Sequence, residues 1–196
     1  MRALVLVPMV LVVATGCGPT RIPARAPQLP APLIEPLPVV IALRYAPELY
    51  SLDPWPSEPD RGVFPGLGAA TRATFDQVFA AAFQELNSSG DPDERERVEA
   101  PVDGVVELRL DWVSLDSEKV IFLGLVLDLR DATDQPVSTW QVFGRGRTPE
   151  QALRHASAQL LAKLRYDPEP LAWVGQITRP ADAEPAGEGL LAEERP

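Results

Sequence analysis

Only a few side chains in this sequence have the chemistry that covalent or acid–base catalysis requires. The chain has a single cysteine, Cys17, and a single histidine, His155. A catalytic histidine needs a positioned nucleophile and an orienting partner, and no serine stands in a recognisable nucleophile turn. One histidine and one cysteine also fall short of an ordinary zinc site. We therefore expect His155 to lie at the surface, and we predict no enzymatic activity, no bound metal and no cofactor.

The charged residues in the second half of the chain fit turns better than binding sites. Asp128, Asp131 and Asp134 lack the ligand spacing and the glycine of a calcium-binding loop, so we expect solvated acids. Residues 144–149, GRGRTP, join a strand to a helix start, where an anion could be held. They lack the third glycine of a dinucleotide fingerprint and the Lys-Ser/Thr of a P-loop. We predict a turn followed by a helix cap at Thr148, with anion contact as the alternative.

Cys17 follows a short apolar segment at the start of the chain. Arg2 precedes about ten mostly apolar residues, and small residues then lead to the cysteine in the order VATGCG. This order is typical of an export signal. The apolar run is shorter than the roughly 20 residues that a spanning helix needs. The setting of Cys17 resembles a bacterial lipobox.

The resemblance to bacterial lipoprotein signals implies a lipid anchor. It implies that residues 1–16 are a signal peptide cleaved before Cys17, that diacylglycerol alkylates the thiol, and that a fatty acid such as palmitate acylates the new amino terminus. Several acyl chains together anchor a protein stably. Gly18 stands where an inner-membrane retention signal commonly has Asp, so the resemblance implies the outer membrane, facing the periplasm. The alternatives are an ordinary secretory peptide with an incidental cysteine, or an uncleaved start.

The length and the charge of the chain suit one acidic domain. About 180 residues remain after residue 16, which fits a single core. The net charge of -10 would repel nucleic acid. The proline-rich residues 17–38 are expected to carry the lipid and to form a stiff, extended spacer, a passive tether rather than a docking motif. Residues 180–196 are expected to be a disordered acidic tail, which leaves residues 39–179 as a single periplasmic domain.

Hydrophobic periodicity predicts a strand, a helix, three strands and a second helix in that domain. Short β-branched runs indicate strands, and apolar residues three and four apart indicate helices. In the second strand, alternation places Leu110 and Trp112 together on the buried face. Thr148 and Gln151 form a capping box at the start of the second helix. The strands are expected at residues 39–45, 106–112, 120–130 and 137–143, and the helices at residues 69–86 and 148–166.

This order predicts an α+β fold with a four-stranded, mostly antiparallel sheet. Both helices are expected on one face of the sheet, which leaves the other face available. The element order over residues 39–166 is similar to that of small envelope lipoproteins, among them the lipopolysaccharide-assembly lipoprotein and the lipoprotein activators of peptidoglycan synthases. The resemblance rests on element order alone, and it implies an interaction or assembly role in the cell envelope.

Four aromatic residues are candidates for a partner surface. Trp55 and Trp173 lie in proline-flanked segments outside the predicted elements, and Tyr45 and Tyr50 lie nearby in the sequence. Trp and Tyr dominate binding hot spots, so their exposure would mark a binding surface. The alternative is that the flanking segments pack onto the domain.

Together these patterns predict a membrane-anchored lipoprotein that acts as a non-catalytic interaction or assembly module. Its expected partners are the outer-membrane bilayer, through acylated Cys17, and an unidentified envelope protein. The alternative function is binding of a lipid or a cell-wall glycan. A pocket lined by apolar residues would favour that alternative, whereas a flat face with exposed Trp or Tyr would favour a protein partner.

Overall fold

The computed structural model describes residues 19–30, 35–57, 62–88 and 101–178. The predicted signal peptide, Cys17 and the predicted acidic tail at residues 180–196 lie outside the described residues. Within the described residues, no helix is long and apolar enough to span a membrane.

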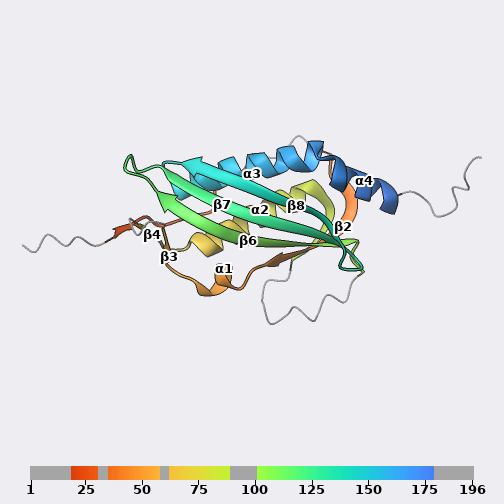
Figure 1. The fold of residues 1–196 in the computed structure, drawn as a ribbon, viewed down its shortest axis with the longest axis horizontal. Helices are drawn as coiled ribbons and strands as arrows, with labels where there is room; N and C mark the ends of the chain where they lie inside the picture. The colour runs from red at the N-terminus through yellow and green to blue at the C-terminus, as the bar shows by residue number, and fades with distance from the viewer. Residues whose placement is uncertain (1–18, 31–34, 58–61, 89–100, 179–196) are drawn as a thin grey trace, which may run out of the picture.

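A five-stranded mixed sheet forms the centre of the fold (Figure 1), with the strand order β5-β2-β6-β7-β8. Strand β2 pairs in parallel with β5 and with β6, whereas β6, β7 and β8 form an antiparallel meander. The α+β class and the meander are confirmed, but the expected four-stranded sheet is wrong. The five strands are β2 (Leu37–Tyr45), β5 (Phe83–Ser88), β6 (Gly104–Leu115), β7 (Ile121–Asp131) and β8 (Pro136–Gly146).

The additional strand comes from the end of the predicted first helix. Helix α2 (Leu67–Ala82) ends at Phe83, whose φ of -123° and ψ of 153° are extended, and the chain continues as β5. Phe83 and Leu86 fit the helical spacing, but this segment instead pairs with β2 and covers an edge that would otherwise hold unpaired backbone groups. Tertiary pairing therefore overrides the local periodicity.

A second, three-stranded sheet holds the start of the described chain. Its outer strands, β1 and β3, pair with β4 in parallel and antiparallel orientation respectively. Beyond β1, the Ile22 N–H donates to the Val63 carbonyl oxygen at 3.0 Å and the Ala24 N–H donates to the Pro65 carbonyl oxygen at 2.8 Å. The strands are β1 (Thr20–Arg21), β3 (Trp55–Pro56) and β4 (Gly62–Phe64).

The proline-rich segment is therefore docked on the domain. Ile22, Ala24 and Leu29 pack against the hydrophobic core. The expected free spacer over residues 17–38 is wrong for residues 19–30, because the non-proline residues between the prolines supply the N–H groups and the apolar side chains that hold the segment in place. Proline fixes an extended backbone, and here that backbone lies along the protein.

Helices α2 and α3 lie side by side on one face of the large sheet (Figure 1). Helix α3 (Pro149–Tyr166) follows β8 directly and packs against it. The core lies between these helices and the sheet, where Trp140 is fully buried and its indole N–H donates to Asp167 Oδ2 at 2.9 Å. The predicted end of this helix at Asp167 is confirmed, but a further helix, α4 (Pro168–Ile177), follows it. A short helix, α1 (Glu48–Ser51), lies against α2.

An irregularity in β6 decides which face of the sheet Trp112 occupies. Leu110 lies opposite Leu125, but Trp112 lies opposite Gly124, so Asp111 is an extra residue in the ladder. A bulge of this kind reverses the alternation of side chains. Val113 is buried after the bulge, and Trp112 turns to the face away from the helices. The predicted burial of Trp112 on the same face as Leu110 is wrong for this reason.

Strand β8 forms one edge of the large sheet, and α3 supplies a side chain to it. The backbone N–H of Phe143 donates a hydrogen bond of 3.0 Å to Oε1 of Gln159. A backbone donor at the border of the sheet is thereby satisfied by a side chain.

Candidate functional site

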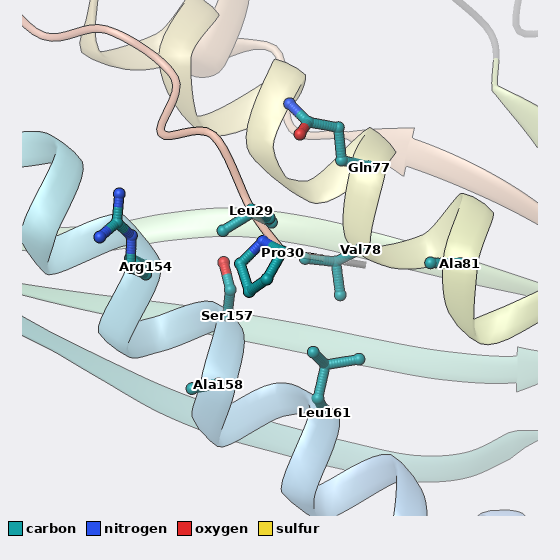
Figure 2. A pocket seen from close by; sticks show the side chains of 9 residues that line it. All are labelled: Leu29, Pro30, Gln77, Val78, Ala81, Arg154, Ser157, Ala158 and Leu161. Atoms are coloured by element: carbon teal, nitrogen blue, oxygen red, sulfur yellow. The ribbon is translucent and has the colours of Figure 1, made fainter. Parts of the chain in front are cut away.

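An apolar groove lies between α2 and α3 on the helical side of the sheet (Figure 2). Its volume is about 530 Å³, which falls in the range of small-molecule sites, roughly 300–1,000 Å³. We call it the α2–α3 groove. It is lined by Gln77, Val78 and Ala81 of α2, by Arg154, Ser157, Ala158 and Leu161 of α3, and by Leu29 and Pro30 of the N-terminal segment.

The side chains that face the groove explain why it is open and apolar. Ala81 on α2 and Ala158 on α3 are too short to fill the space between the helices, while Val78 and Leu161 supply branched walls. Leu29 and Pro30 come from the docked N-terminal segment and close one side of the groove (Figure 2). The residues predicted as part of a spacer therefore contribute to the lining of this apolar groove.

Polar groups are few in this groove, and most of them are already engaged. The Ser157 hydroxyl donates to the Leu153 carbonyl oxygen at 2.8 Å, and Gln77 Nε2 donates to the Ala73 carbonyl oxygen at 3.0 Å. Arg154 is exposed at the rim of the groove, and Leu161 lies further along the same helix, α3 (Figure 2). The only ion pair among the described residues joins Arg130 and Asp134, so the Arg154 guanidinium is available to an anion.

This lining offers binding chemistry and no catalytic chemistry. A carboxylate or an imidazole is absent from the residues that line the groove, and the one hydroxyl is committed to a backbone carbonyl. Over the part of the chain that the structure describes, no group of three or more His, Cys, Asp or Glu side chains could hold a metal ion. The groove can hold a hydrocarbon chain by apolar contact, with one cation at its rim.

The aromatic residues predicted to form a partner surface are largely buried. Trp55 is 7% exposed, Trp173 is 8% exposed and Tyr45 is 4% exposed, and all three belong to the hydrophobic core. Trp55 lies in β3, and Trp173 in α4 packs against Gly104 at the start of β6. The candidate partner surface at the two tryptophans is not exposed, because their proline-flanked segments fold onto the domain. This outcome corresponds to the packing alternative.

Tyr45 and Tyr50 belong to a polar cluster that joins β2 to α2. The Tyr45 hydroxyl oxygen lies 2.7 Å from Asp76 Oδ1 and 2.9 Å from the Arg72 carbonyl oxygen. The Arg72 guanidinium lies 4.0 Å from the centroid of the Tyr50 ring, and the Tyr45 and Tyr50 rings meet edge to face. Burial, followed by the hydrogen bond to Asp76, raises the pKa of Tyr45 well above its ordinary value. The cluster has a structural role.

The remaining sequence predictions concern turns and caps. His155 is exposed, as predicted. Thr148 caps α3, since its hydroxyl oxygen accepts the Gln151 N–H at 3.3 Å, and Gln151 Oε1 accepts the Arg147 N–H at 2.9 Å. Asp131 accepts hydrogen bonds in its turn from Thr133 and from the Gln135 N–H, which lowers its pKa. These polar residues serve local structure.

The residues that sequence reasoning missed are those of the α2–α3 groove. Arg154 stands on the polar side of a predicted amphipathic helix, and nothing in the sequence distinguishes it from other surface arginines. Leu29 and Pro30 lie in the segment predicted to be a spacer. One signal was present there, because the apolar residues Ile22, Ala24 and Leu29 recur among the prolines.

Comparison with known proteins adds two partial likenesses of the fold. No family model matches the chain, and no curated protein matches it. Protein XCC0632 from Xanthomonas campestris, of family DUF330, is 12% identical, with a TM-score of 0.43 over 81% of this chain and 98% of that one. A PelC dodecamer from Paraburkholderia phytofirmans is 12% identical, with a TM-score of 0.43 over 69% of this chain and 94% of that one. Both are similar to this chain in part of the backbone arrangement alone.

Proposed function

We propose that this chain is a lipid-anchored, non-catalytic binding module of the bacterial envelope, and that its α2–α3 groove takes the hydrocarbon chain of an amphiphile. The apolar groove between the two helices is the observation that carries the binding role. The lipobox-like setting of Cys17 supports attachment to the outer membrane, facing the periplasm.

The chemistry of the groove favours a lipid over a cell-wall glycan. A glycan needs hydrogen-bonding groups along its length, because its hydroxyls lose their water on binding. The groove offers apolar side chains along its length and polar groups only at Gln77, Ser157 and Arg154, two of which already donate to backbone carbonyls. A hydrocarbon chain in the groove with an anionic head near Arg154 matches this distribution.

The structure also favours a lipid ligand over a protein partner for the folded domain. Exposed side chains at Trp55 and Trp173 would have favoured a protein partner, and these side chains are buried. An apolar pocket is the feature that distinguishes the lipid-binding alternative. We therefore propose lipid binding as the role of the folded domain, with the anchor holding that domain near its ligand.

A groove-filling variant tests the binding role. We expect the wild-type protein to bind cis-parinaric acid, with an increase in the fluorescence of this fatty acid. Ala81→Trp places an indole inside the groove and should abolish that increase. Ala80→Trp is the matched control, because Ala80 is the preceding residue of α2 and is exposed outside the groove. Equal binding by both variants would contradict the proposed site.

The anchor is tested separately. Cells that make the wild-type chain should incorporate radiolabelled palmitate into it, and globomycin should make the uncleaved precursor accumulate. Cys17→Ser should lose the label and leave the membrane fraction. Absence of label from the wild-type chain would overturn the anchor and would leave the binding role of the groove to be judged by its own experiment.

A further inference from the structure

Three aromatic side chains lie together on the face of the large sheet opposite the helices. Trp112 of β6 and Phe143 of β8 flank Gly124 of β7, and the centroids of the two rings are 6.3 Å apart. Phe122 lies two residues before Gly124 on β7, on the same face. Phe143 is 48% exposed, although it is a large apolar side chain. We call Trp112, Phe122 and Phe143 the aromatic patch.

The packing around Gly124 shows how the patch is built. A methyl group at Gly124 would overlap the Trp112 indole, so the indole lies directly over this glycine. The bulge at Asp111 is what brings Trp112 to this face. Beside it, the Arg145 guanidinium lies 5.5 Å from the centroid of the Phe122 ring, within the range of a cation–π contact.

The patch lies at the end of the sheet where the described chain begins. Leu115, Ile121 and Gly146 form the last row of β6, β7 and β8, one row beyond Phe122 and three rows beyond Trp112 and Phe143. Gly62, which pairs with Thr20, lies against the Leu115 side chain. Figure 1 shows β4 and the turn between β6 and β7 at the same end of the molecule, with α4 at the other end.

The few residues between Cys17 and Thr20 limit the distance between a lipid anchor at Cys17 and this end of the large sheet. Only Gly18 and Pro19 stand between Cys17 and Thr20. Three residue steps span at most about 11 Å even when fully extended. Because Thr20 is held in β1, an acylated Cys17 would keep this end of the sheet close to the bilayer surface.

The charges of this end differ from those of the chain as a whole. Lys119, Arg145 and Arg147 are exposed here, although the chain carries a net charge of -10. Glu118 and Asp111 are exposed acids near them, and Asp116 Oδ1 is occupied by the N–H groups of Glu118 and Val120.

The opposite end is acidic in comparison. The turn between β7 and β8 carries Asp131 and Asp134, with Arg130 paired to Asp134 at 3.4 Å. Lys163 and Arg165 end α3 at this side, where Asp167 and Glu169 follow them, so acids still outnumber bases there. The aromatic patch with its arginine and lysine neighbours lies at the end that the anchor would hold.

We propose that the aromatic patch, with Arg145 and Lys119, contacts the headgroup region of the membrane to which the protein is anchored. The proposal rests on the lipid anchor of the proposed function. Aromatic rings prefer the interface between hydrocarbon and water, and Lys and Arg extend their charged groups toward the headgroups. The anchor and the patch together would orient the domain, with the end that bears α4 directed away from the bilayer.

Tryptophan quenching by brominated lipid tests the contact. The acylated full-length protein is reconstituted into vesicles of phosphatidylethanolamine and phosphatidylglycerol whose acyl chains carry bromine near the headgroups. We expect quenching of the emission of Trp112, one of the four tryptophans. Trp112→Phe should abolish the quenching. The control Trp173→Phe, which removes a buried tryptophan in α4, should leave it unchanged.

The outcomes separate this inference from the anchor. The intact mass of the same preparation shows whether acyl chains are present. If they are present but the wild-type protein shows no quenching, or if Trp112→Phe is quenched equally, the membrane contact is refuted while the anchor stands. If crosslinking without quenching shows that the patch joins two protein molecules, the face is a protein interface and the proposal is also refuted. Absence of acyl chains would refute the anchor and this inference together.

Discussion

The hydroxyl oxygen of Tyr45 lies 2.7 Å from Oδ1 of Asp76, and this contact joins strand β2, which lies between β5 and β6, to helix α2. Tyr45 is buried, whereas Asp76 is partly buried. The loss of a hydrogen-bond partner from a poorly hydrated carboxylate costs about 1–3 kcal/mol. Tyr45→Phe should therefore lower the free energy of unfolding by about that amount at neutral pH. Urea denaturation measures the change, and Tyr166→Phe, at an exposed tyrosine, should have almost no effect.

The same contact predicts a dependence of stability on alkaline pH. The pKa of Tyr45 is raised in the folded protein, first by burial and then by Asp76, so the unfolded chain loses this proton near pH 10 while the folded chain keeps it. The stabilisation is complete below that pH and is lost as the pH rises further. The wild-type protein should lose more stability than Tyr45→Phe between about pH 8 and about pH 11. Parallel losses in the two proteins would contradict the assignment.

Two helical glycines should respond in opposite ways to substitution by alanine. A methyl group at Gly68 in α2 would overlap the carbonyl group of Leu49, whereas a methyl group at Gly175 in α4 would meet no atom within 4 Å. Gly68→Ala should destabilise the protein by about 1–3 kcal/mol, because backbone must move. Gly175→Ala should stabilise it by about 0.5–1 kcal/mol, because alanine is the better helix former. Thermal unfolding compares the two, and stabilisation by Gly68→Ala would show that α1 and α2 are not packed as described.

The cap at the start of α3 should contribute measurably to stability. The Thr148 hydroxyl oxygen accepts the Gln151 N–H, and Thr148→Ala removes this acceptor. Such substitutions cost about 1 kcal/mol. Thr148→Ser keeps the acceptor and should retain most of the stability in the same denaturation experiment. A large loss in the serine variant would point to the threonine methyl group instead of the cap.

Arg154 should select for the head group of a ligand in the α2–α3 groove. An exposed ion pair contributes about 0.2–1 kcal/mol, which corresponds to an affinity change of up to about fivefold. Arg154→Glu should weaken the binding of cis-parinaric acid by about fivefold or more, since the substitution removes the ion pair and the new charge repels the carboxylate. Arg154→Lys should bind nearly as the wild type does. The methyl ester of the same acid, which has no charge, should bind both variants equally, and an equal loss for the ester would show that Arg154 acts through packing.

Local patterns in the sequence were enough to predict the helix cap at Thr148 and the antiparallel meander. Both depend on residues close together in the chain, and both are present in the structure. Strand β5 was missed because Phe83 and Leu86 satisfy a helical period, and only pairing with β2 makes the segment extended. Trp112 was placed on the wrong face because a single extra residue at Asp111 reverses the alternation, and nothing in the sequence of β6 marks that residue.

The candidate site was harder to predict from the sequence than the fold. The groove depends on the distance between two helices that are far apart in the sequence and on the docking of Leu29 and Pro30 between them. Proline frequency indicates an extended backbone, but it does not show whether that backbone extends into solvent or along the protein surface. Tertiary hydrogen bonds such as that from Ala24 to Pro65 decide this.

The side-chain amide of Gln159, which accepts the N–H of Phe143, has a consequence for how copies of this protein would behave if the proposed anchor gathered them on a bilayer. An open border strand is a template on which strands of neighbouring molecules can polymerise. With one of its donors already engaged by α3, the β8 border is a poorer seed for such growth. Crowding on a two-dimensional surface should then be tolerated without fibril formation.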